Sequence, residues 1–438
     1  TQHKRISGWV LLRVDKKIQD MMTVHKDGEK KYSLDKNIRG ELLEKADREH
    51  IELSEGVRRV IELVQLGSKS SVAKFGRMVG RADDDDSRVR GAFVYAGASQ
   101  TLRYASRGLQ LHNMARICFN AKQAEDLKEQ MKDGYILEDD NGDLPVMQTL
   151  SKLLRPALIP ETGKVFVVGD WSSIEARALP WLAQSEYAKD RLELFKQDVD
   201  IYVNTAEELG LGERQIGKVA ELSLGYGGGL GAFSAMAKIY GVSMDDTTVS
   251  GIIQAWREKN IWATVFWSQL ERAATLAIRN PSQEQTAGRV KYLYIEDLLG
   301  GVLLCILPGD LVIQYPKAKL ESVDTKWGPR LNITAMKANW HPKQDEKEWP
   351  RVALWPGLLA ENVTQAFCAG ILRHSLRELH ADAAPVVGHV HDEILLEVEL
   401  SSAQIAKDEL QRVMETPPTW AEGLPLKAEP VIMTRYGK

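Results

Sequence analysis

The chain is poor in cysteine, lacks long apolar runs and carries little net charge. Its three cysteines, Cys118, Cys305 and Cys368, lie far apart among 438 residues and form no CxxC pair. This usage predicts a reducing compartment and argues against a thiolate metal cluster. No apolar run is long enough to cross a membrane and no signal peptide opens the chain, so we expect a cytoplasmic protein without membrane contact.

The charge balance is nearly even. Lysine and arginine number 57 against 61 aspartates and glutamates, a formal net charge of −4. This balance disfavours extended phosphate contacts, which need Lys and Arg, although a local basic groove stays compatible with it. The acidic run at residues 83–86 fits a solvated loop, because metal sites rarely use four consecutive carboxylates. A length of 438 residues predicts two or three lobes.

Apolar spacing predicts both helices and strands. Residues 1–30 read as short strands and turns, and residues 33–67 as charged helices. A buried strand is expected at 165–170, helices from there to about residue 280, mixed strands and loops at 281–350, and a long helix at 361–379. Strands separated by a large helical insertion predict an α+β core with a helical lobe.

Two segments place carboxylates at the ends of buried strands. The stretch VVGHVHDEILLEV (386–398) reads as a hairpin with Asp392 and Glu393 at its tip, and VFVVGD ends in Asp170. A carboxylate taken out of water is costly without a cation. If both strands end at one sheet edge, Mg²⁺ fits, because it takes oxygen ligands and keeps positions for water and phosphate. The alternative is a solvated turn and an unrelated strand end.

A helix is expected over RQIGKVAELSLGYG (214–227). Its residues Arg214, Lys218, Leu222 and Tyr226 recur every four positions, which gives one face that runs from cationic to aromatic. A triphosphate would suit the cationic end and a base the aromatic end. The alternative is an ordinary amphipathic surface helix. The glycines that follow are not a P-loop, because no GK[ST] comes after them.

These segments, in this order, resemble family A DNA polymerases of the bacterial DNA polymerase I type, and more closely their phage branch. DWSSIEAR (170–177) is similar to motif A, DYSQIELR; residues 214–227 are similar to motif B, RxxxKxxxFxxxYG; and HDE (391–393) is similar to motif C. YAGASQTLRYASRGLQLHNMAR (95–116) is similar to the loop that phage enzymes write roughly as HGAxxTGRWSGRGxQPQNLPR. The resemblance covers nearly the whole chain.

The resemblance implies an α+β right-hand polymerase with a thumb, a palm built on an antiparallel sheet and helical fingers. The implied segments are a palm-associated N-terminal segment at 1–29, the thumb at 30–92, the first palm part at 93–178, the fingers at 179–351 and the second palm part at 352–438. No DxE sequence before residue 95 makes a convincing paired-acid exonuclease motif, so a proofreading activity is expected either upstream of this sequence or not at all. Because the chain begins with threonine, we expect further domains upstream.

The resemblance also implies a template-directed DNA polymerase that adds dNTPs to a primer 3′-OH by two-metal-ion nucleotidyl transfer. Two Mg²⁺ ions would be ligated by Asp170, Asp392 and the carbonyl of Trp171, and Lys218 would donate a proton to the leaving group. The implied partners are primer-template DNA and dNTPs, with an upstream exonuclease domain or replication accessory proteins as further candidates. A monomer is expected, and phage genome replication in a bacterial cytoplasm is the expected setting.

The remaining implied roles divide between nucleotide and DNA. Glu175 would contact Tyr226 and exclude a ribose 2′-OH. The other nucleotide-binding candidates are Arg214, Lys218, Leu222 and Tyr202. The DNA-binding candidates are Arg103, Asn113, Gln365, His391, Glu393, Lys69, Lys74 and Arg77.

Six positions depart from the family patterns. In the 95–116 loop, Leu102 replaces a Gly, His112 a Gln and Ala115 a Pro. Leu222 stands where the family has Phe or Tyr, Tyr202 stands where many members have the His of DIH, and Leu311 replaces the Arg of LPSGRxLxYP. Loss of the aromatic ring at position 222 predicts slower incorporation and altered tolerance of 3′-deoxy terminators. The rival interpretations are a single-subunit RNA polymerase-like enzyme, a two-metal nuclease and a non-catalytic primer-template binding module.

Overall fold

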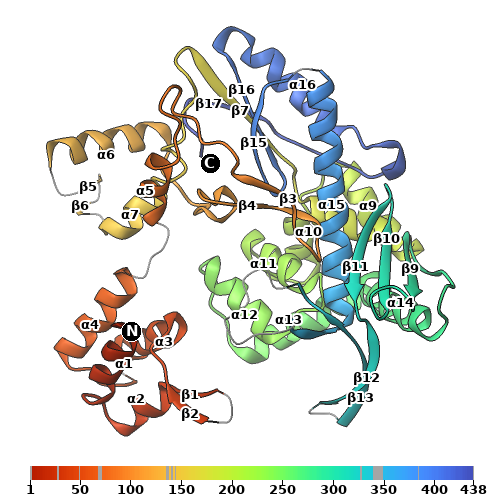
Figure 1. Ribbon diagram of the computed structural model, residues 1–438, viewed down its shortest axis with the longest axis horizontal. Coiled ribbons are helices and arrows are strands. Elements are labelled where there is room, and N and C mark those ends of the chain that lie inside the picture. The colour runs from red at the N-terminus through yellow and green to blue at the C-terminus, as the bar shows by residue number, and fades with distance from the viewer. Residues whose placement is uncertain are drawn as a thin grey trace. The chain divides into compact units, whose positions relative to one another are not determined.

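The computed structural model describes residues 2–26, 29–48, 50–67, 72–134, 138–139, 142–143, 145–325, 328–338, 349–382 and 384–437. The chain divides into two compact units, one of residues 1–90, 113–158 and 437–438, and one of residues 91–112 and 159–436. Both contain helices and antiparallel strands (Figure 1), which confirms the predicted α+β class. The two units cut across the five predicted segments, whose bounds stay predictions.

The first unit begins with a helical module around its own small core. It comprises α1 (Gln2–Leu11), α2 (Lys16–Met21), the hairpin β1 (Thr23–Lys26) and β2 (Glu29–Tyr32), α3 (Lys36–Asp47) and α4 (Glu55–Gly67). The expectation of strands and turns at residues 1–30 is therefore wrong for most of them. Ile6 and Val10 lie one helical turn apart and pack with Ile18, while Asp15 caps α2 by accepting the Ile18 N–H.

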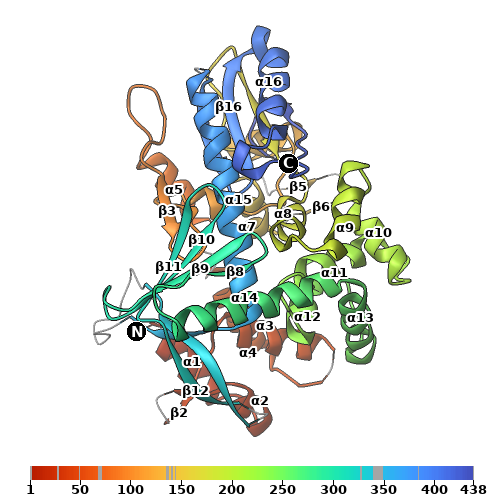
Figure 2. The same ribbon diagram turned by 90° about the vertical axis from the view of Figure 1, so that its right-hand side faces the viewer.

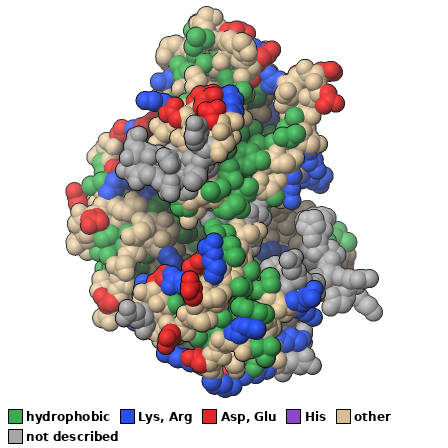
Figure 3. All heavy atoms as spheres, turned by 90° about the vertical axis from the view of Figure 1, so that its left-hand side faces the viewer, with side chains coloured by type: hydrophobic (Ala, Val, Ile, Leu, Met, Phe, Trp, Pro, Cys, Tyr) green, Lys and Arg blue, Asp and Glu red, His purple; other side chains and the backbone are tan. Residues whose placement is uncertain are grey.

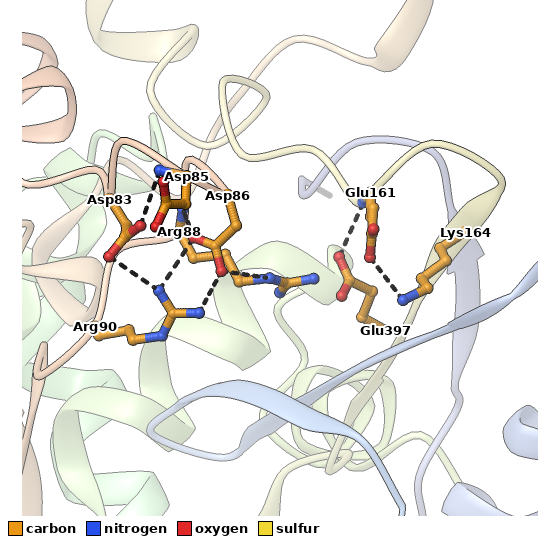
Figure 4. A network of polar contacts seen from close by, with 8 residues as sticks. All are labelled: Asp83, Asp85, Asp86, Arg88, Arg90, Glu161, Lys164 and Glu397. Carbon is orange, nitrogen blue, oxygen red and sulfur yellow. Dashed lines mark hydrogen bonds and ion pairs between the residues drawn. The ribbon is translucent and has the colours of Figure 1, made fainter.

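The rest of the first unit contains α5 (Ala73–Val79), α6 (Ala121–Asp133), β5 (Glu138–Asp139), β6 (Gly142–Asp143) and α7 (Val146–Lys152). The acidic run at 83–86 is an exposed loop held by basic neighbours, as Figure 4 shows. Arg90 forms ion pairs with Asp83 and Asp86, and Arg88 forms one with Asp86. Arginine side chains that follow the run in the sequence therefore balance part of its charge, which agrees with the interpretation as a solvated loop.

The second unit is built on a four-stranded antiparallel sheet in the order β15 (Val386–Val390), β16 (Glu393–Glu399), β7 (Lys164–Asp170) and β17 (Val431–Met433). Residues 165–169 of β7 are buried, as their apolar run predicts. Helix α16 (Ala403–Glu415) packs on β7 so closely that a Cβ on Gly169 would lie 2.6 Å from the Met414 sulfur. At the far end of β7, Lys164 pairs with Glu161, whose N–H donates to Glu397 of β16 (Figure 4).

A lobe of seven helices follows β7. Their bounds are α8 (Ile174–Ala183), α9 (Glu186–Lys196), α10 (Ile201–Glu208), α11 (Arg214–Leu224), α12 (Leu230–Ile239), α13 (Asp246–Lys259) and α14 (Ile261–Arg279). Glu221 of α11 is the hub of a buried polar network: it pairs with Arg191 of α9 (2.5 Å) and accepts hydrogen bonds from Thr205 of α10 and Trp256 of α13 (2.8 Å each). This fully partnered network fixes α11 against three neighbouring helices.

The mixed region predicted at 281–350 contains two antiparallel sheets (Figure 2). One holds β8 (Gln285–Ala287), β9 (Val290–Ile295), β10 (Val302–Leu307) and β11 (Leu311–Pro316); the other holds β12 (Lys319–Thr325), β13 (Gly328–Met336) and β14 (Arg351–Leu354). The remaining elements are β3 (Phe93–Ala98), β4 (Arg103–Ser106), α15 (Pro356–Ala381) and the 3₁₀ turns Leu111–Asn113, Leu400–Ser402 and Thr419–Ala421.

Two further features concern the hydropathy of the helices and the charge on the surface. Within the described part of the chain, none of the helices combines the length and apolarity that a membrane crossing requires. On the face shown in Figure 3, basic and acidic side chains are interspersed.

Candidate active site

The two predicted metal-binding acids lie at one edge of the central sheet. Asp170 is the last residue of β7 and pairs in register with Glu393, the first residue of β16. Asp392 lies in the two-residue turn between β15 and β16, where His391 adopts a left-handed backbone (φ 54°) as primed hairpin turns require. The N–H of Trp171 donates to the carbonyl of Asp392 at 3.1 Å. Backbone pairing therefore brings together acids that lie far apart in the sequence.

The electrostatics of this edge favour a cation. Burial and the neighbouring charge of Asp170 raise the pKa of the Asp392 carboxyl to about 7. A divalent ion would remove that penalty by compensating both carboxylates. Among the described residues no cluster of three or more His, Cys, Asp or Glu side chains could hold a metal ion, so the donor set here is two carboxylates. That set fits Mg²⁺, which takes one or two carboxylates and fills its other positions with water and substrate phosphates.

A second cluster joins α8, β4 and the end of α11. Glu175, in the first turn of α8, accepts a hydrogen bond from the hydroxyl of Tyr226 at 2.5 Å and forms an ion pair with Arg103 of β4. Burial, followed by the charge of Glu175, raises the pKa of Tyr226 well above its ordinary value, so the phenol stays a donor. The structure thus places Glu175 and Tyr226 in direct contact and engages Arg103 with the same carboxylate.

The cationic residues of α11 rest on aromatic rings. The guanidinium carbon of Arg214 lies 5.1 Å from the ring centre of Tyr202, and Lys218 Nζ lies 5.7 Å from Tyr202 and 4.9 Å from Tyr240. The Ser173 hydroxyl donates to the Tyr202 hydroxyl at 3.0 Å, which fixes that ring. Arg214 also donates from Nε to Asp200 at 2.7 Å. Both cations are thus held in defined positions by neighbours outside α11.

Helix α11 approaches α10 closely at one glycine. A Cβ on Gly217 would lie 2.0 Å from the Tyr202 carbonyl oxygen and 2.9 Å from the Ala206 nitrogen. No side chain fits there, so glycine is required at this point of contact. The contact brings the start of α11 beside the start of α10, where Asp200 and Tyr202 lie.

Two hollows border this helix. A hollow of about 340 Å³ has a mostly polar lining that includes three cations and three acids: Ser172, Ser173, Tyr202, Arg177, Arg214, Lys427, Asp198, Asp200 and Glu429. A smaller one of about 60 Å³ is lined in part by Glu175, Tyr226 and Leu222. Leu222 is 39% exposed. The polar hollow lies at the cationic end of α11 and the apolar hollow at its aromatic end, the order that the sequence predicts for phosphate and base.

The remaining DNA-binding candidates of the second unit contact other side chains of the chain. Glu393 is buried and accepts a hydrogen bond from Tyr436. His391 lies beside the buried ring of His112, with 5.1 Å between ring centres. Gln365 donates to Glu361 at 3.4 Å within α15. Their contacts with DNA stay predictions.

The candidates of the first unit are placed as follows. Lys74 is buried, and its Nζ donates to the carbonyl of Asn113 at 2.8 Å. Burial lowers the pKa of Lys74. Arg77 is exposed on α5, and Lys69 lies outside the described residues. In this structure Lys74 therefore supports loop backbone, while its role toward DNA stays a prediction.

Sequence reasoning missed several residues of the site. Asp200, Ser173 and Tyr240 contact Arg214, Tyr202 and Lys218 but were not among the predicted site residues. The signal for Asp200 was present, because an aspartate before an apolar helical segment is a helix cap. The sequence did not predict the ion pair of Asp200 with Arg214, because the two residues belong to different helices.

Comparisons with known proteins agree with these motifs. No family model matches the chain. Over 399 residues the chain is 33% identical to a protein of Bacillus phage SP02 named DNA polymerase, and the match covers 88% of this chain and 58% of that protein. The chain thus spans less than two thirds of its phage relative.

A solved structure shows the same fold. The POL domain of Pol1 from M. smegmatis, in complex with DNA primer-template and dNTP, matches with a TM-score of 0.55 at 13% identity, over 99% of this chain and 64% of that one. The fold is therefore that of a polymerase domain. Together the two matches confirm the resemblance that the motifs indicate: the chain is similar to the polymerase region of phage-type family A DNA polymerases.

Proposed function

We propose that the chain is a template-directed DNA polymerase that transfers nucleotides from dNTPs to a primer 3′-OH with two Mg²⁺ ions. The observation that carries the proposal is the sheet edge where backbone pairing joins Asp170, Trp171 and Asp392. The name of the phage relative and the primer-template and dNTP bound to the solved Pol1 domain point in the same direction. Phage genome replication is the setting that this relative suggests.

The site residues divide the work. Asp170, Asp392 and the carbonyl of Trp171 would hold the ions. When bound, the two ions lower the pKa of the attacking hydroxyl and stabilise charge on the departing pyrophosphate. Arg214 and Lys218 bind the triphosphate from the α11 face, and Lys218 holds a proton for the leaving group.

The Glu175–Tyr226 pair selects the sugar. Its hydrogen bond at 2.5 Å places a carboxylate and a phenol side by side beside the apolar hollow. A ribose 2′-OH at this position would crowd the pair, whereas a deoxyribose would not. The same pair argues against an RNA polymerase, which must admit the 2′-OH. Arg103, Gln365 and His391 would contact the primer-template near this point.

Primer extension tests the proposal. Wild-type chain should extend a labelled primer on a template with dNTPs and Mg²⁺, and Asp392→Ala should not, while both bind the primer-template equally. A wild-type chain that binds the duplex without extending the primer would instead support the non-catalytic binding module. Degradation of the primer under the same conditions would support a nuclease.

A further inference from the structure

Asp200 divides its two carboxylate oxygens between two tasks. Oδ1 accepts the backbone N–H groups of Tyr202 (2.9 Å) and Val203 (3.2 Å), and Oδ2 accepts the Nε–H of Arg214 (2.7 Å). The first task caps α10, as aspartate does at many helix starts. The second joins α10 to the first residue of α11 and serves no cap. This ion pair holds the negative carboxylate of Asp200 against the Arg214 guanidinium, which faces the proposed triphosphate site.

The ion pair lies on the lining of the polar hollow. Asp200 and Arg214 both line this space of about 340 Å³, together with Ser172 and Ser173, which follow Asp170 in the chain. A triphosphate that reaches Arg214 through the hollow brings its oxygens beside the Asp200 carboxylate. A guanidinium shared by two anions attracts each of them less than it would attract one anion alone. The Asp200 carboxylate and the triphosphate therefore compete for the same cation, the Arg214 guanidinium.

We propose that Asp200 is a resident anion that competes with the incoming triphosphate for Arg214 and so sets the affinity of the chain for nucleotides. The inference rests on the proposed function. The side chains of Arg214 and Asp200 are 50% and 42% exposed. Because solvent weakens ion pairs that are this exposed, we expect the competition to change the affinity for nucleotide a few-fold. The helical cap is separate from this competition, because the other oxygen makes it.

Asp200→Asn tests the competition without removing the cap. Asparagine caps helices about as well as aspartate, and its Oδ1 can keep both N–H partners. Its amide nitrogen cannot accept a hydrogen bond from Arg214, and its charge is gone. We expect the Kd for dATP with Mg²⁺, measured by equilibrium titration of the whole chain, to fall about two- to fivefold. The KM for dATP in primer extension should fall by a similar factor and by more than kcat changes.

Two matched variants separate this effect from general causes. Asp245 caps α13 through the N–H groups of Thr247 and Thr248, and its other oxygen accepts the Thr248 hydroxyl, so Asp245→Asn changes a cap without touching an arginine. Glu213 precedes Arg214, is exposed and makes no side-chain cap, so Glu213→Gln removes one charge at the same end of α11. Both should leave the Kd for dATP within about 1.5-fold of wild type.

The Arg214→Ala background decides the mechanism. If the competition acts through this arginine, adding Asp200→Asn to Arg214→Ala leaves the Kd for dATP unchanged. The inference fails if Asp200→Asn weakens binding, if Glu213→Gln matches its effect, or if the effect persists without Arg214. Titration reads binding directly, so a chain that binds dATP as expected but never extends a primer would refute the proposed function and spare this inference.

Discussion

The acids at the sheet edge and the cations of α11 are positioned in opposite ways. Asp170 and Asp392 sit at the ends of strands that are buried and paired, and backbone hydrogen bonds set their separation. Arg214 and Lys218 sit on one helix, and aromatic rings and an aspartate from outside that helix hold their side chains. The positions of the acids therefore depend on backbone pairing, whereas the positions of the cations depend on side-chain contacts from neighbouring helices. Substitutions in each region test this difference.

Loss of one sheet-edge acid should abolish most of the activity. Asp170→Asn keeps the size of the side chain but removes a charge that Mg²⁺ binding requires, so single-turnover extension should slow on the order of 10³-fold or more. Asp382→Asn is the control, because that aspartate pairs with Arg412 at the exposed end of α15. A loss of about tenfold or less in Asp170→Asn would contradict the metal role.

Loss of a cation should cost less. Lys218→Ala removes the proposed proton donor, whose contribution is about 10²–10⁴-fold. The rate of nucleotide incorporation at saturating dNTP measures it. Lys238→Ala, on the neighbouring helix α12, should extend primers at the wild-type rate. Equal rates for the two variants would remove Lys218 from the chemistry.

Loss of Glu175 should change sugar selection more than rate. Glu175→Ala opens space beside Tyr226, so discrimination between dATP and ATP in extension should fall by about 10²-fold. It also leaves the Tyr226 hydroxyl and Arg103 without the carboxylate, which costs about 1–3 kcal/mol of stability. Unchanged discrimination in a folded variant would assign the selection elsewhere.

Crowding the contact of α10 with α11 should be felt as a loss of stability. A Cβ at position 217 would lie 2.0 Å from the Tyr202 oxygen, so Gly217→Ala forces the helices apart at a cost of about 1–3 kcal/mol. Gly231→Ala on α12 meets no atom within 4 Å and should stabilise slightly. Thermal unfolding of the two variants measures the difference, and equal melting temperatures would mean that the helices yield.

Substitution of Leu222 should have the mildest consequence. Leu222→Phe restores an aromatic face next to the apolar hollow, worth about 0.5–1.5 kcal/mol, or about two- to tenfold. The ratio of dideoxy- to deoxynucleotide incorporation should shift by that factor. An unchanged ratio would show that the hollow does not receive the sugar or base.

The sequence predicted the parts of the site that depend on local periodicity. Runs of apolar and β-branched residues indicated the strands that carry Asp170 and Asp392, and four-residue spacing indicated the face of α11. It did not predict α1 and α2, because short polar helices depend on packing with residues as distant as Ile61. It also could not predict the Asp200–Arg214 pair or the role of Gly217. Both depend on how neighbouring helices dock, which no single-segment pattern records.

The register in which β7 pairs with β16 sets where Asp170 lies relative to Asp392. Because side chains alternate across a strand, a slip of one residue would send Asp170 to the opposite face while Asp392 stayed in its turn. Chain length between Lys164 and Asp170 is therefore fixed, whereas loops elsewhere are free to lengthen. Insertions engineered into this chain should be tolerated along the loops before a single residue is tolerated in either of these strands.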